Sequence, residues 1–234
     1  MNHADLIRSL GANRKILQRQ AAEGLAAAAT EHPHIVDNLR GALSDPDSRT
    51  RWGAAYALGL IDDALDLRAM PTLIEALASS DGDIRWAAAE LVVRLGKRDR
   101  AAVGERLLML SREGNLNARK MALYCLRDIG GNSEELLGAA EQCCADNHSL
   151  LKMAALSLIS RIANSGERAA HLALHLLEDD PDEGVRRCAA VALGHIGDRS
   201  PRVIDALQRA ANDNRDIYLN RAANAALVRL GESQ

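Results

Sequence analysis

The chain has 234 residues, of which 47% are hydrophobic, but it contains no Phe and only 2% of its residues are aromatic. Its 29 basic and 32 acidic residues nearly cancel, which argues against a broad nucleic-acid or membrane-surface field. No apolar run approaches the roughly 20 residues of a membrane span, and the N-terminus shows no secretory pattern. The four Cys lack any CxxC pairing, which is typical of buried, reduced thiols. Together with an Arg-rich, Lys-poor composition, these features predict a helical, cytoplasmic, bacterial protein.

The first 30 residues are predicted to cap the fold. Residues 1–12 favour a short helix, and residues 14–29 favour an amphipathic helix with Ala21, Leu25 and Ala28 on one face. We interpret this second helix as a degenerate first copy of a repeat, because a terminal repeat must turn one side to water.

After residue 30 the chain alternates between two kinds of helix, A and B. The A helices are predicted at 33–44, 69–79, 101–113, 134–146, 167–178 and 201–212. The B helices are predicted at 48–61, 84–95, 117–129, 149–162, 184–196 and 217–230. Their copies start at Arg51, Arg85, Arg119, Lys152, Arg186 and Asn220, at intervals of 34, 34, 33, 34 and 34 residues. We number each B helix from that residue, as position zero; the regular interval predicts a stack of helical hairpins.

Three columns within the B helices indicate the core. Position three is Ala in all six copies, which predicts close approach of a neighbouring helix. Positions seven and ten are aliphatic in every copy, and spacings of three and four residues place these columns on one helix face. One column of the A helices is also predicted to be buried: Leu39, Leu73, Leu107, Ala140, Leu174 and Leu207.

The connections between helices carry capping residues. Asp and Asn in the A-to-B turns are predicted to cap the B helices, in runs that include 45–47, 81–83, 146–147, 179–182 and 213–214. Glycine is expected to end four B helices, at Gly96, Gly130, Gly197 and Gly231. Pro71 and Pro201 are expected near the starts of A helices.

The run Val185-Arg-Arg-Cys-Ala-Ala-Val-Ala-Leu-Gly-His-Ile-Gly197 resembles the HEAT repeat, particularly the short subtype of phycobilisome-lyase-like proteins. The resemblance covers about residues 14–231. It implies an all-α, right-handed, armadillo-like solenoid of about six and a half hairpins, forming a single domain over residues 1–234. It also implies that the B helices line a concave face. Asn220 and Asp62 depart from the pattern, where Arg and Gly are usual.

Positions one, five and nine of the B helices form a stripe on that face. Four of the five aromatic residues and six cations fall on it, against two carboxylates. The predicted binding residues are Trp52, Tyr56, Trp86, Glu90, Arg94, Lys120, Tyr124, Arg161, Arg187 and Arg221. We expect a groove for a protein or peptide of acidic and partly apolar character, with Trp and Tyr as anchors. The alternative is that these aromatics only fill gaps between B helices.

Two further groups favour structural roles. The position-zero residues are predicted to form a ladder with turn carboxylates such as Asp47, Asp83 and Asp182. His171, His175 and Glu178 have the spacing of metal ligands on one helix side, but no fourth ligand lies nearby in sequence, and no metal site is predicted.

A non-catalytic adaptor, chaperone or scaffold is favoured over an enzyme. Walker, Rossmann, Ser-His-Asp and GxSxG patterns are absent, as is the His-Glu dipeptide of HEAT-type deoxyhypusine hydroxylases. No catalytic residue and no cofactor is therefore predicted. The alternatives are a phycobilin lyase subunit-like protein that handles a chromophore and, ranked below it, a HEAT-like DNA glycosylase-type binder. The net charge of −3 argues against the second.

Overall fold

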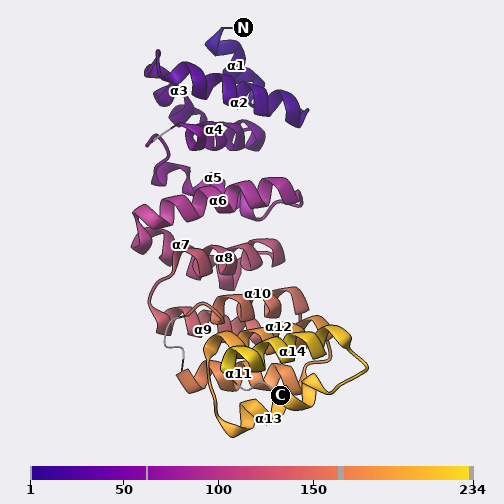
Figure 1. The fold of residues 1–234 in the computed structure, drawn as a ribbon. Coiled ribbons are helices and arrows are strands. Elements are labelled where there is room, and N and C mark those ends of the chain that lie inside the picture. Colours follow the sequence, from indigo (N-terminus) through magenta and orange to yellow (C-terminus); the bar gives the residue numbers. More distant parts are fainter. Residues whose placement is uncertain (1, 62, 163–165, 232–234) are drawn as a thin grey trace. The chain divides into compact units, whose positions relative to one another are not determined.

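The computed structural model describes residues 2–61, 63–162 and 166–231, and all regular structure within them is helical (Figure 1). The α-helices are α1 (His3–Ser9), α2 (Lys15–Ala29), α3 (His34–Ala42), α4 (Ser48–Leu60), α5 (Met70–Leu77), α6 (Gly82–Arg98), α7 (Arg100–Glu113), α8 (Leu116–Ile129), α9 (Ser133–Cys144), α10 (Ser149–Ile159), α11 (Gly166–Asp179), α12 (Glu183–Ile196), α13 (Pro201–Ala211) and α14 (Ile217–Leu230). A 3₁₀ turn, η1 (Leu67–Ala69), precedes α5. The predicted all-α repeat fold is confirmed, and the predicted A and B helices all form within a few residues of their expected ends.

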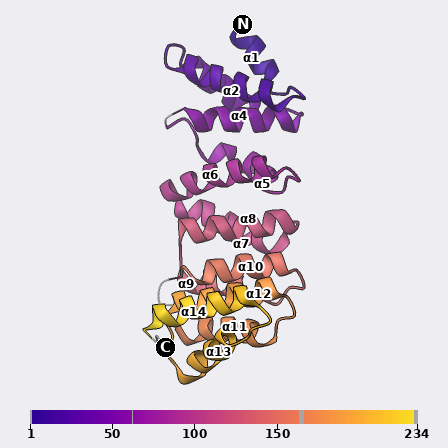
Figure 2. The ribbon, with the colours of Figure 1, turned by 45° about the vertical axis from the view of Figure 1, so that its right-hand side comes forward.

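The chain divides into two compact units, Met1–Val103 and Gly104–Gln234, with the boundary inside α7. In unit 1 the B-type helices α2, α4 and α6 pack side by side, as both ribbon views show (Figures 1 and 2). Helices α1, α3 and α5 pack against them as the A layer. Because α1 packs on α2, the first 30 residues form a complete, if degenerate, hairpin.

Unit 2 repeats the same two-layer plan. The B helices α8, α10, α12 and α14 contact one another in chain order, and the A helices α9, α11 and α13 pack behind them. The inner hairpins of unit 2, α9–α10 and α11–α12, therefore bury one side against the helices before them and the other against the hairpin after them.

Most residues of the predicted core columns are buried in both units, but Ile61 and Ile196 at position ten are only half-buried. All six position-three alanines, Ala54, Ala88, Ala122, Ala155, Ala189 and Ala223, have 0% exposure. Position seven is at most 2% exposed in every copy, and the A-helix column at most 3%. Close approach of neighbouring B helices is explicit at Gly194, where an added Cβ would lie 2.8 Å from Cα of Ala226 on α14. Small residues thus set the spacing of this layer.

Most predicted caps form, with three corrections. Helix α10 has His148 as its N-cap, without a side-chain capping bond, so the cap predicted at Asp146 and Asn147 does not form. Asp47, Asp81, Asn115 and Asp182 cap α4, α6, α8 and α12 through their side chains. Helix α14 is capped by Asp216 rather than by Asp213 or Asn214, because the chain makes one more turn before the helix starts. Gly96 does not end α6, which continues to Arg98. Gly130, Gly197 and Gly231 do end their helices, with positive φ angles.

The position-zero ladder exists, but the predicted partners were wrong. Asp47 and Asp182 cap the helices of their own hairpins, so they do not pair with position zero. The Arg side chains reach back to backbone carbonyls of their own A-to-B turn, as Arg51 does to Asp45 at 2.8 Å. Several also pair forward with the next hairpin, as Arg119 does with Asp146 (2.8 Å) and Lys152 with Asp180 (2.6 Å). Each such residue ties one turn to its neighbour.

Candidate functional site

The predicted stripe lies on the outer side of the B layer in each unit. Trp86, Glu90 and Arg94 of α6 are exposed, and Trp52 and Tyr56 of α4 are half-buried. In unit 2, Arg161 and Arg221 are exposed, whereas Lys120, Tyr124 and Arg187 are half-buried. None of the predicted residues belongs to the core. A continuous groove would cross the boundary between the units, and it stays a prediction. Each unit has its own exposed B-helix face.

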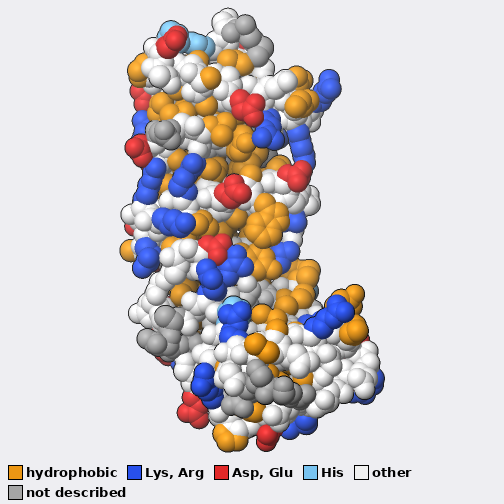
Figure 3. Space-filling view, viewed as in Figure 1, with side chains coloured by type: hydrophobic (Ala, Val, Ile, Leu, Met, Phe, Trp, Pro, Cys, Tyr) orange, Lys and Arg blue, Asp and Glu red, His pale blue; other side chains and the backbone are white. Residues whose placement is uncertain are grey.

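The face of unit 1 carries an apolar cleft. It has a volume of about 430 Å³ and lies where α2, α4 and α6 present their N-terminal halves. Trp52 and Tyr56 of α4 form one wall, with ring centroids 5.8 Å apart. Ile16 of α2, which is 53% exposed, and Ile84 of α6 add aliphatic surface. Figure 3 shows hydrophobic side chains gathered on this face over α4 and α6.

The charges at the edge of this cleft are paired with one another. Lys15 forms ion pairs with Asp81 and Asp83, the latter at 3.3 Å, and these bonds raise the pKa of Lys15. The same lysine holds the pKa of Asp81 below its usual range. Arg19 pairs with Glu23 at 2.9 Å along α2. With these charges neutralised, the cleft offers apolar surface inside a polar rim, which is the usual anatomy of a protein-binding patch.

Trp52 also borders a second, more polar hollow of about 370 Å³ on the side of the A-to-B turns. Ser48, Arg49, Glu75 and Ser79 are among its lining residues. Trp86 and Glu90 line neither hollow of unit 1. The structure therefore brings together two of the predicted anchors, Trp52 and Tyr56, whereas Trp86 does not line the cleft.

In unit 2 several predicted contact residues are engaged within the protein. The Arg127 guanidinium lies 5.2 Å from the Tyr124 ring centroid and pairs with Asp128 at 2.7 Å. Arg187 pairs with Asp216 at 2.9 Å and with Glu183 at 2.7 Å. Arg187 is therefore neutralised rather than exposed as a free cation, because α14 brings a carboxylate beside it.

The other cations of this face are not neutralised in this way. Within the described residues of unit 2, Lys120, Arg161, Arg221 and Arg229 form no ion pair with a carboxylate. The basic character of the B-helix face of unit 2 therefore rests on these four residues. Arg229 occupies position nine of the stripe but is not among the predicted binding residues.

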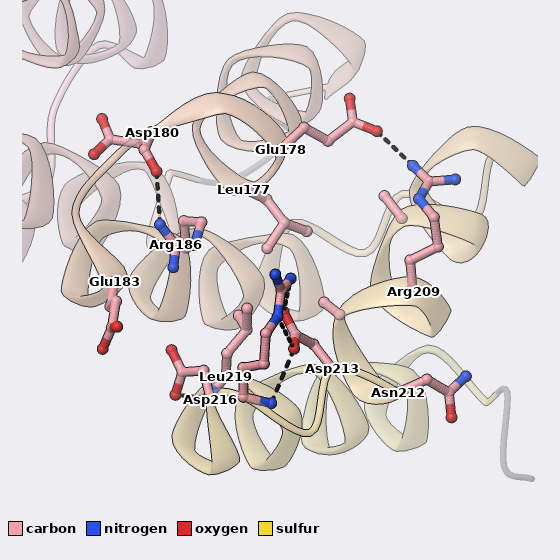
Figure 4. Close-up of a pocket in the computed structure, with 13 residues that line it drawn as sticks. Leu177, Glu178, Asp180, Glu183, Arg186, Arg209, Asn212, Asp213, Asp216 and Leu219 are labelled. Atoms are coloured by element: carbon pink, nitrogen blue, oxygen red, sulfur yellow. Dashed lines mark hydrogen bonds and ion pairs between the residues drawn. The ribbon is translucent and has the colours of Figure 1, made fainter.

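A hollow larger than the two of unit 1 lies in unit 2, among the A-to-B turns of α11–α14, with a volume of about 870 Å³ (Figure 4). Its lining residues are charged, but most of these charged side chains are paired within the protein. Glu178 accepts from Arg209 at 2.6 Å, Asp213 accepts from Arg215 at 2.9 Å, and Arg186 donates to the backbone carbonyl of Asp180 at 2.9 Å. This hollow was not predicted, and its internal pairing leaves little charge for a ligand.

The His171, His175 and Glu178 motif does not converge. His175 pairs with Asp179 at 2.8 Å, and Glu178 pairs with Arg209 at 2.6 Å. Among the side chains that the structure describes, no group of three or more His, Cys, Asp or Glu is arranged to hold a metal ion. Equally, none of the described helices has the length and apolarity to cross a membrane.

Sequence reasoning missed the contribution of α2 to the cleft. Counting back 33 residues from Arg51 places Gln18 at position zero, and Gln18 does donate to the backbone carbonyls of Leu10 (2.6 Å) and Arg49 (3.0 Å). That register would have placed Arg19, which also lines the cleft, at position one beside Trp52. The signal was weak because Gln replaces the repeated Arg.

Comparisons with known proteins agree with this architecture. The E. coli protein YibA has a similar structure, with a TM-score of 0.60 and 16% identity, covering 100% of this chain and 93% of that one. An engineered protein matches with a TM-score of 0.56 and 21% identity over 84% of this chain and 96% of its own. A designed armadillo repeat protein in complex with the peptide (KR)4 matches with a TM-score of 0.50 and 15% identity over 98% of this chain and 100% of its own.

These similarities show the fold alone, and no curated protein matches the sequence. The model of HEAT repeats matches residues 4–92 and 139–228, which is more than half of the chain. The protein belongs to the HEAT-repeat family.

Proposed function

We propose that this HEAT-repeat protein is a non-catalytic adaptor, chaperone or scaffold that binds another protein through the exposed face of its B helices. The observation that carries the proposal is the apolar cleft beside Trp52. Its volume of about 430 Å³ falls in the range of sites that take small ligands or a few side chains. An aromatic pair against exposed aliphatic surface, inside a rim of paired charges, suits a hydrophobic side chain of a partner.

Trp52 and Tyr56 are positioned to contact a partner rather than to fill the core. Trp52 and Tyr56 are half-buried, so their positions are held while part of each ring faces the cleft. Core packing of α4 is supplied by other residues, such as Ala54 and Leu58, at 0% and 1% exposure. A pre-positioned aromatic surface loses little conformational entropy on binding, which favours affinity.

The partner that fits best has acidic as well as apolar groups. The unpaired cations on the B-helix face of unit 2 support the acidic part, and the cleft of unit 1 supports the apolar part. A phosphate-dominated partner is disfavoured, because the chain as a whole carries a net charge of −3.

The proposal is tested with peptides selected from a random display library on the full-length protein. Their affinities are then measured by fluorescence polarisation for wild type, Trp52→Ala/Trp86→Ala and Met109→Ala. Met109 is the control, because it is a large apolar residue with 56% exposure on the A helix α7, outside the B-helix face. We expect the double variant to bind at least about 30-fold more weakly, the loss typical of an interface hot spot, with the helical CD signal unchanged.

Two results would contradict the proposal. If the double variant loses its helical CD signal, the tryptophans are packing residues, as the alternative interpretation of the stripe holds. If its fold persists and the selected peptides bind it as tightly as wild type, the cleft is not the binding site.

A further inference from the structure

A row of cationic side chains follows the carboxyl ends of three consecutive B helices in unit 2. Position nine is Arg161 just beyond α10, His195 in the last turn of α12 and Arg229 in the last turn of α14. All three side chains are exposed. We call these residues the cation row. Since α10 packs on α12 and α12 on α14, the row is continuous within this unit.

The members of the row are close enough to affect one another. Nη1 of Arg229 lies 3.3 Å from Nδ1 of His195. A guanidinium can only donate, so Nδ1 accepts and the imidazole is neutral in this arrangement. Partial burial lowers the pKa of His195, and the positive charges of Arg229 and Arg161 lower it further. The imidazole thus experiences a positive potential from both neighbours.

The positive charge of the row is not compensated within the described part of unit 2. Neither Arg161 nor Arg229 forms an ion pair with a described carboxylate, whereas Arg187 on the same face forms two. The nearby Asp198 accepts from the backbone N–H and the hydroxyl of Ser200, at 2.8 and 3.2 Å. Arg161 and Arg229 carry like charges that repel one another, so an anion placed along the row is favoured by both.

The alternative to a binding role is that these cations stabilise the ends of their helices. Cations in the last turn of a helix stabilise the helix dipole, by about 0.3–1 kcal/mol each at exposed positions. In unit 1 the position-nine residue Arg94 serves in this way, because it donates to the backbone carbonyl of Gly59 at the end of α4. No such bond holds Arg161 or Arg229 among the described residues. The difference between the units favours a binding role for the row in unit 2.

The surface beside the row indicates which anion it suits. Position five on the same helices is Val191, which is 45% exposed, and the exposed Ala225. A cation row flanked by small aliphatic residues matches a peptide that alternates carboxylates with apolar side chains. We infer that the cation row binds the carboxylates of an acidic segment in a partner protein. This inference rests on the proposed function, since it takes the partner to be a protein.

The test uses the full chain and a labelled oligoglutamate peptide, followed by fluorescence polarisation at low ionic strength. The variant Arg161→Gln/Arg229→Gln removes the two permanent charges of the row. The matched control, Arg106→Gln/Arg112→Gln, removes the same charge from exposed positions on the A helix α7 of unit 2. We expect the row variant to bind at least about tenfold more weakly and the control to stay within about twofold of wild type, because only the row contacts the carboxylates.

The inference is overturned if wild type does not bind the acidic peptide, or if both variants lose affinity equally. It is also overturned if a single-stranded oligonucleotide competes more strongly than the peptide and depends on the same two arginines, since the row would then serve phosphates. Trp52→Ala/Trp86→Ala should bind oligoglutamate as wild type does. Failure of the apolar cleft and failure of the cation row are therefore distinguished.

Discussion

The two units share one buried plan and differ on the surface of their B helices. In both, position three is a fully buried alanine and position seven a buried aliphatic residue. Yet unit 1 presents an apolar cleft between Trp52 and Ile16, and unit 2 presents the cation row from Arg161 to Arg229. The comparison shows that stacking constrains only the inward columns, so the outward positions can differ from repeat to repeat.

The largest expected effect distinguishes the two tryptophans of unit 1 by substituting each of them alone. Trp52 lines the cleft and Trp86, 54% exposed, does not. We expect Trp52→Ala alone to weaken selected peptides by about 30-fold or more, and Trp86→Ala by only a few-fold, as for a rim residue. Polarisation titrations of both single variants measure the difference. Equal losses would show that the whole aromatic stripe, rather than the cleft, forms the site.

A second prediction compares equivalent glycines at position eight. An added Cβ at Gly194 would lie 2.8 Å from backbone Cα of Ala226, whereas at Gly59 it would meet the end of the Leu91 side chain. Backbone cannot yield as a side chain can, so Gly194→Ala should destabilise the protein by about 1–3 kcal/mol and Gly59→Ala by less. Urea unfolding of both variants tests this. Gly138→Ala is the control, because its Cβ would enter open space.

A third prediction makes the face of unit 2 more basic. Asp216, only 6% exposed, caps α14 and neutralises Arg187. Asp216→Asn keeps a capping side chain but removes the charge, so oligoglutamate should bind a few-fold more tightly at a small loss of stability. Polarisation and urea unfolding report the two effects. Unchanged or weaker peptide binding would indicate that Arg187 lies outside the acidic site.

The smallest effect concerns pH. The pKa of His195 is held below its usual value in the free protein, by burial and by Arg229 and Arg161. A bound carboxylate favours the imidazolium, so binding takes up a proton and affinity should rise as the pH falls below about 6.5. We expect a gain of a few-fold in oligoglutamate binding between pH 7.5 and 6 that His195→Gln abolishes. The same pH response in the His195→Gln variant would assign it to another group.

Much of the fold followed from the periodicity of the sequence. The position-three alanines and the A-helix column from Leu39 to Leu207 were recognised by spacing alone, and they are buried. The resemblance to HEAT repeats implied that the B helices line one face, and the spacing of four residues placed positions one, five and nine on it. The errors have local causes: Gly96 sits mid-helix because α6 continues to Arg98, and Gln18 was not recognised because it replaces the repeated Arg.

The repeated hairpins can be predicted from the sequence, because a recurring 34-residue pattern with apolar spacings of three and four defines both the helices and their buried faces. Which outward residues act together depends on how the helices stack. Lys15 meets Asp83 across 68 residues, and Arg187 meets Asp216 across 29. Such pairs depend on the offset between stacked helices, which no local pattern records. They neutralise the rim of the cleft in unit 1 and the guanidinium of Arg187 in unit 2, whereas Arg161 and Arg229 pair with no described carboxylate.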